Sequence, residues 1–93
     1  MKLPVNYNYL DANARRTVRN IYMGIQNGLC AECKESLSGP PSKWILGKTI
    51  NKNLFPENFF KFPVHLHHDH DSGLTIGAVH CECNAVLWQY YGK

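Results

Sequence analysis

Residues 65–84 read HLHHDHDSGLTIGAVHCECN, and this stretch combines a turn signal with two groups of possible metal ligands. The residues after Pro63 are typical of a short strand, and the Asp-Ser-Gly sequence at 71–73 is a turn signal. Residues 74–79 have the composition of a second strand, in which Gly77 indicates a bulge or a close backbone approach. The stretch therefore predicts a β-hairpin.

A short C-terminal helix is predicted over residues 84–91 (NAVLWQYY), with Gly92 at its end. Upstream, residues 10–26 predict an amphipathic N-terminal helix that Asp11 or Asn13 could cap and that ends near Asn27-Gly28. Its apolar face carries residues at three- and four-residue spacing, namely Leu10, Ala14, Val18, Ile21 and Ile25.

Three arginines, Arg15, Arg16 and Arg19, fall within one third of the circumference of this helix, away from its apolar face. Such a patch is by itself most often a solvated face. Beside a nuclease centre it becomes a DNA-binding surface, because guanidinium groups bind phosphates well.

The stretch between the helix and the hairpin shows no clean period. Ser-Gly-Pro-Pro-Ser at 38–42 breaks regular structure, and residues 43–62 are interpreted as an irregular, partly strand-like insertion. The aromatic residues of this insertion are expected to complete a thin core rather than to stack on bases.

The chain has 93 residues, a length that indicates one domain, residues 1–93, with a marginal core. Its net charge is +3. Small folds of this kind usually need a disulfide, a metal or a partner. No signal peptide or membrane span is recognisable, so we expect a cytoplasmic protein, in whose reducing surroundings four cysteines favour a metal site.

Cysteine and histidine residues form two pairs of possible metal ligands, at residues 30–33 and 80–83. Cys30-x-x-Cys33 is followed much later by His80-x-x-Cys83, and Zn²⁺ accepts such a Cys₃His set with tetrahedral geometry. Cys81 is an alternative to His80, which would give a Cys₄ site with one pair at x spacing. The x-x spacing favours His80, and four protein ligands make this zinc structural.

All five histidines lie between positions 65 and 80, and four of them fall in the run His65-Leu66-His67-His68-Asp69-His70. A lone histidine is usually a core or surface residue. A cluster of histidines beside aspartates is costly to bury, and it indicates that these residues bind a metal or transfer a proton.

These motifs resemble the HNH signature of the phage recombination endonuclease VII family. His68 falls on its catalytic histidine and Asn84 on its asparagine, while the cysteine pairs fall on its zinc ligands. The resemblance spans about 55 residues from Cys30, although the insertion within this span matches no part of the family pattern. It implies an α+β, zinc-stapled ββα-metal HNH fold with residues 63–91 as its core.

The family resemblance implies an HNH endonuclease that hydrolyses DNA phosphodiester bonds by nicking or double-strand cleavage. His68 would be the general base. His67 and Asn84 would hold one catalytic divalent cation, Mg²⁺, Mn²⁺ or Ni²⁺, and His70 would assist at the phosphate or as a further ligand. DNA is the expected partner, and a homodimer or a phage protein is a possible further one.

The sequence departs from the family pattern in three places. His67 stands where the family has an aspartate, which puts the preferred cation in doubt. His80 replaces a cysteine, which a structural zinc tolerates. Only nine residues follow Asn84, so Holliday-junction cleavage is not carried over.

Two other functions are compatible with the motifs. A non-catalytic zinc-binding nucleic-acid module would keep the zinc ligands and would have no use for His68 and Asn84. A Cys-x-x-Cys redox protein is disfavoured, because no βαβ pattern surrounds the motif. A phage or mobile-element origin, within the host cell, follows from the family resemblance alone.

Overall fold

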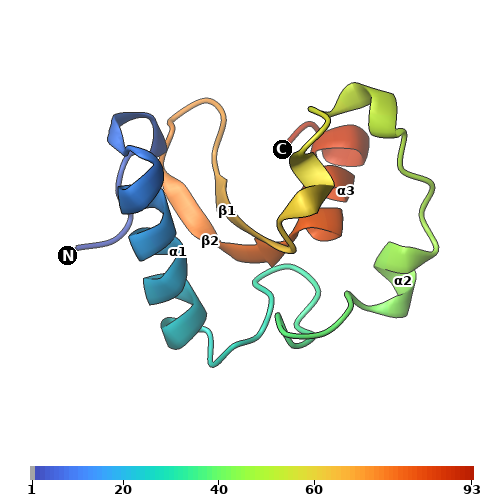
Figure 1. The fold of residues 1–93 in the computed structure, drawn as a ribbon, viewed down its shortest axis with the longest axis horizontal. Coiled ribbons are helices and arrows are strands. Elements are labelled where there is room, and N and C mark those ends of the chain that lie inside the picture. Colours follow the sequence, from blue (N-terminus) through green and yellow to red (C-terminus); the bar gives the residue numbers. More distant parts are fainter. Residues whose placement is uncertain (1) are drawn as a thin grey trace.

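The computed structural model describes residues 2–93 and shows a small α+β fold (Figure 1). A two-stranded antiparallel sheet lies between the long N-terminal helix and the C-terminal helix, as Figure 1 shows. None of the helices in the described part of the chain is long and apolar enough to span a membrane. The regular elements are α1 (Ala12–Ile25), α2 (Lys43–Leu46), β1 (Val64–His68), β2 (Thr75–His80) and α3 (Cys81–Tyr91), with short 3₁₀ helices at Tyr7–Tyr9, Lys52–Leu54 and Phe59–Lys61.

The predicted β-hairpin is confirmed. Val64 pairs with His80 at one end and His67 with Gly77 nearer the turn, after which the register shifts so that His68 pairs with Thr75. The carboxylate of Asp69 accepts hydrogen bonds at 2.8 Å from the backbone N–H groups of residues 71 and 72. Asp69 is therefore a turn-forming residue, in the way that aspartate side chains often close turns.

The N-terminal helix is confirmed, but one residue of its predicted buried face is exposed. Asp11 caps α1 by accepting a hydrogen bond from the N–H of Ala14 at 2.8 Å. Val18 and Tyr22 are the buried residues of α1, whereas Ile25 is 65% exposed. Tyr22 replaces Ile25 in the core because its hydroxyl lies 2.8 Å from the hydroxyl of Thr75 on β2, which satisfies the polar end of a buried ring.

The C-terminal helix begins at Cys81, three residues before the predicted start at Asn84. The first turn of α3 therefore includes Cys83 and Asn84, and it follows β2 without a loop. Gly92 ends the helix in the left-handed conformation, with φ of 69°, as the sequence predicts.

The stretch at 43–62 was wrongly expected to be partly strand-like. It contains α2 and two 3₁₀ helices, and no strand is found in this segment of the described chain. Its polar residues close local turns instead of pairing with a neighbouring strand, as when Asn51 accepts a hydrogen bond from the N–H of Asn53 at 3.1 Å. The contribution to the core that was expected of its aromatic residues comes instead from Ile45, which is fully buried, whereas Trp44 is 49% and Phe62 52% exposed.

The close backbone approach expected at Gly77 is confirmed. A Cβ atom at Gly77 would lie 2.8 Å from Oε1 of Gln26 and 3.0 Å from Cβ of Ala31. Gln26 cannot easily move away, because its amide group exchanges hydrogen bonds of 2.9 Å with the backbone N–H and C=O of Ala78. Gly77 thus lets the segment after α1 lie directly against β2.

We predict that Gly77→Ala lowers stability by about 1–3 kcal/mol, because the added methyl group overpacks this contact. Thermal unfolding followed by circular dichroism measures the change. Gly24→Ala is the matched control, since a Cβ at this exposed helical position meets nothing within 4 Å. The control should be neutral or more stable by up to about 1 kcal/mol, and equal melting temperatures for the two variants would contradict the contact's importance.

Candidate metal centre and histidine cleft

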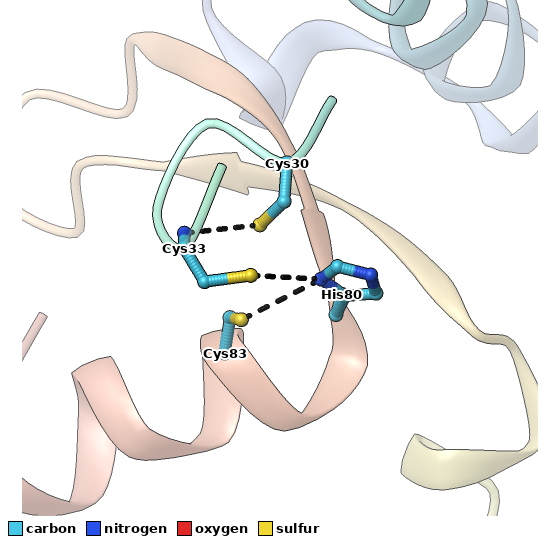
Figure 2. Close-up of side chains that lie close together, drawn as sticks. All are labelled: Cys30, Cys33, His80 and Cys83. Carbon is cyan, nitrogen blue, oxygen red and sulfur yellow. Dashed lines mark hydrogen bonds between the residues drawn. The ribbon is translucent and has the colours of Figure 1, made fainter. Parts of the chain in front are cut away.

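The four expected zinc ligands come together at the junction of the hairpin and α3. One possible ligand atom from each of Cys30, Cys33, His80 and Cys83 lies within 4.8 Å of all the others. Figure 2 shows their side chains pointing toward a common centre. A tetrahedral zinc with Zn–S bonds of about 2.3 Å would place its sulfur ligands about 3.8 Å apart, so this buried Cys₃His cluster could hold a structural metal such as zinc.

The hydrogen bonds of His80 fix which of its nitrogens faces the cluster. Nε2 lies 2.8 Å from the carbonyl oxygen of Ser36 and 3.1 Å from that of Gly39, so Nε2 carries the proton and donates it. Nδ1 is left unprotonated, 3.4 Å from Sγ of Cys33 and 3.7 Å from Sγ of Cys83 (Figure 2). Backbone carbonyls commonly orient zinc-binding histidines in this way.

The Cys30-x-x-Cys33 turn surrounds one sulfur with donors. Sγ of Cys30 accepts hydrogen bonds from the backbone N–H of Glu32 at 3.4 Å and of Cys33 at 3.5 Å. A hydrogen bond from Cys83, together with these N–H groups, lowers the pKa of Cys30 to about 4. The cluster therefore favours a thiolate, which is the form that binds metal.

Cys81 does not belong to the cluster. Its thiol donates a hydrogen bond to the Glu82 carboxylate at 3.1 Å, and burial raises the pKa of Cys81 to about 12. Cys81 is also absent from the set of four residues whose ligand atoms lie within 4.8 Å of one another. The structure thus supports His80 over Cys81 as the fourth ligand.

We predict that the purified protein holds one equivalent of zinc. Cys30→Ser and Cys83→Ser should lose it, because each removes a ligand from a closed four-ligand site. Cys81→Ser is the matched control and should keep the metal. Zinc content per protein measured by inductively coupled plasma mass spectrometry decides the matter, and loss of zinc from the Cys81 variant alone would refute the ligand set.

Asn84 connects α3 to His65 of β1. Nε2 of His65 donates to the Phe59 carbonyl oxygen at 2.8 Å, which leaves Nδ1 to accept a hydrogen bond from Nδ2 of Asn84 at 3.1 Å. This hydrogen bond turns the amide nitrogen of Asn84 toward His65 and its amide oxygen away from His65. Burial lowers the pKa of the neighbouring His67, and the Asn84 side chain opposes that shift.

His68 is held by a residue from the N-terminus. Its ring stacks on Tyr7 with 3.9 Å between centroids and 8° between planes, and it lies 5.0 Å from the ring of His70. The guanidinium of Arg15 lies over the same Tyr7 ring, 3.9 Å from its centroid. Burial, with smaller contributions from His70, His67 and Arg15, lowers the pKa of His68 and favours its neutral form.

A cleft of about 650 Å³ runs along β1 between α1 and the aromatic part of the insertion. His68, His70 and Asn84 line this cleft, whereas the side chain of His67 is buried and only 6% exposed. The three predicted DNA-binding residues, Arg15, Arg16 and Arg19, line the cleft as well. The structure therefore brings the arginine patch and most of the predicted catalytic residues to one surface.

Two residues of this site were not singled out from the sequence. Tyr7 lies in an irregular N-terminal segment whose attachment to the hairpin depends on a distant backbone hydrogen bond, from its N–H to the Gly73 carbonyl oxygen at 2.8 Å. No local sequence signal predicts that contact. His65 lay within the recognised cluster, and strand alternation from His67 could have placed it on the same face.

Comparison of the chain with protein-family models, curated proteins and solved structures found no match.

Proposed function

We propose that the chain is a metal-dependent HNH-type endonuclease that hydrolyses DNA phosphodiester bonds. One observation carries the proposal: His68 from β1 and Asn84 from the first turn of α3 line one cleft together with three arginines, and His67 is buried next to His68 in β1. These are the residues that the resemblance to the endonuclease VII family assigns to catalysis. A purely structural zinc module would not require this combination.

His68 has the features of a general base. It is the last residue of β1, and the register shift after His67 ends the regular strand at this point. Its ring lines the cleft, whereas the side chain of His67 is buried. A neutral imidazole there can take a proton from a water molecule that attacks the phosphorus.

His67 and Asn84 would hold the catalytic divalent cation, with Mg²⁺, Mn²⁺ and Ni²⁺ as the candidates. A neutral imidazole and an amide oxygen form a mixed nitrogen and oxygen donor set, which suits Mn²⁺ or Ni²⁺ better than Mg²⁺. When bound, such a cation stabilises charge on the scissile phosphate and on the leaving oxygen. His65 would act as a positioning residue, because its hydrogen bond fixes the amide orientation of Asn84.

The arginines would bind the DNA backbone. Arg15 lies near His68 through their shared contact with Tyr7, and Arg16 and Arg19 continue along the same wall. His70 is exposed in the turn that follows β1. It would contact the phosphate or act as a further ligand of the cation. A guanidinium group can donate two parallel hydrogen bonds to phosphate oxygens, which orients the DNA backbone.

A non-catalytic zinc-binding nucleic-acid module is the second candidate. The Cys₃His cluster and the arginine-lined cleft are sufficient for such a module. It predicts binding that weakens steeply with salt and no strand cleavage. A possible homodimer or phage protein partner would be compatible with either function.

We predict that the zinc-loaded protein converts supercoiled plasmid to nicked or linear DNA with Mn²⁺, Ni²⁺ or Mg²⁺. His68→Ala should slow cleavage about 10²- to 10⁴-fold, since it removes the general base. Asn84→Ala should also impair cleavage, and Asn53→Ala, an exposed asparagine outside the cleft, is its matched control. Agarose gel time courses give the rates.

His65→Ala should raise the cation concentration needed for half-maximal cleavage by about 10- to 100-fold without changing zinc content. Equal cleavage by wild type and His68→Ala would contradict the assignment of the base. A folded, zinc-loaded wild-type protein that cleaves with none of the cations would favour the binding module.

A further inference from the structure

The cleft beside His68 has two chemically different walls. One wall is formed by α1 and carries the three arginines. The opposite wall is apolar and comes from the insertion and from α3. Its aromatic members are Phe55, Phe59, Phe62 and Trp88.

The aromatic wall leaves ring surface open to the cleft. Phe62 is 52% exposed and Trp88 is 42% exposed, although both line the cleft. Phe55 joins this wall by packing 4.6 Å from the ring of Phe59 and 5.6 Å from that of Trp88. An exposed aromatic surface at a concave site commonly marks a place where a ligand binds.

The arginine wall has charge that the protein does not neutralise. Arg15 donates to the Tyr7 carbonyl oxygen at 3.3 Å, and Arg19 donates to the Asn20 amide oxygen at 3.5 Å, so both acceptors are uncharged. Nε of Arg19 is buried without a hydrogen-bond partner. Among the described residues no carboxylate lines the cleft. The wall is therefore complementary to an anion.

We propose that the cleft binds an unpaired nucleotide of single-stranded DNA, with its phosphates against the arginines and its base against Phe62 and Trp88. The inference rests on the proposed nuclease function, and it specifies the class of substrate. Bases inside a duplex are paired and stacked on one another, so they cannot use the aromatic wall. The cleft, at about 650 Å³, falls in the size range of sites for ligands as large as a nucleotide.

Unpaired bases gain affinity from aromatic rings whatever their sequence, because every base has a π-face. The proposal therefore identifies single strands, or the unpaired part of a flap, bubble or frayed end, as the preferred substrate. It places the scissile phosphate beside His68, which lies along β1 between the two walls.

Fluorescence anisotropy with the zinc-loaded wild-type protein, without added divalent cation, tests this inference. The probe is a labelled DNA strand of about 12 nucleotides, within the range of single-strand binding sites, and the comparison is the same strand annealed to its complement. We expect the single strand to bind at least about tenfold more tightly than the duplex at equal salt.

Phe62→Leu and Trp88→Leu should each weaken single-strand binding by about five- to tenfold and leave duplex binding unchanged, since leucine keeps apolar volume but cannot stack. Trp44→Leu is the matched control, because Trp44 is 49% exposed on α2, outside the cleft. Circular dichroism and zinc content show that each variant is folded.

Equal affinity for single strand and duplex would overturn the inference, as would an equal loss of both affinities in the cleft variants. Tighter binding of an RNA strand of the same sequence would overturn the choice of DNA. Dimerisation of the wild type that Phe62→Leu abolishes would assign the aromatic wall to a second copy. Selective single-strand binding without cleavage by any cation would refute the nuclease while supporting the inference.

Discussion

The structure depends most on the convergence of Cys30, Cys33, His80 and Cys83 at the junction of β2 and α3. The hydrophobic core is small, and Cys30, His80 and Cys83 are themselves among the largest fully buried side chains. A metal held by these residues would tie the segment after α1 to the hairpin and the C-terminal helix. Metal binding of this kind contributes about 10–16 kcal/mol in small zinc domains, which exceeds what so thin a core supplies alone.

The same helical turn serves both the metal cluster and the histidine cleft. Cys83 and Asn84 are consecutive in α3, so their side chains leave the helix about 100° apart. Cys83 points into the cluster in Figure 2, whereas Asn84 reaches His65 on β1. Fixing the start of α3 with the metal ligands therefore also fixes where Asn84 lies relative to β1.

Much of this arrangement follows from local sequence signals. The hairpin, the cap at Asp11, the close approach at Gly77 and the Cys₃His set depend on turn residues, spacing and ligand chemistry, which act over short ranges. The contacts of Tyr7 and the burial of Tyr22 depend on which distant segments meet. The insertion has no hydrophobic period that would predict its elements, and its polar residues close local turns, as Asn51 does, in place of the expected strand.

The dependence of the fold on the metal is tested most directly by two-dimensional ¹H–¹⁵N spectra of the zinc-loaded protein before and after a strong chelator is added. The account predicts that removing zinc collapses the dispersed amide signals of β1, β2 and α3, and that adding zinc back restores them. A dispersed spectrum that stays unchanged after the protein has lost all of its metal would contradict the account.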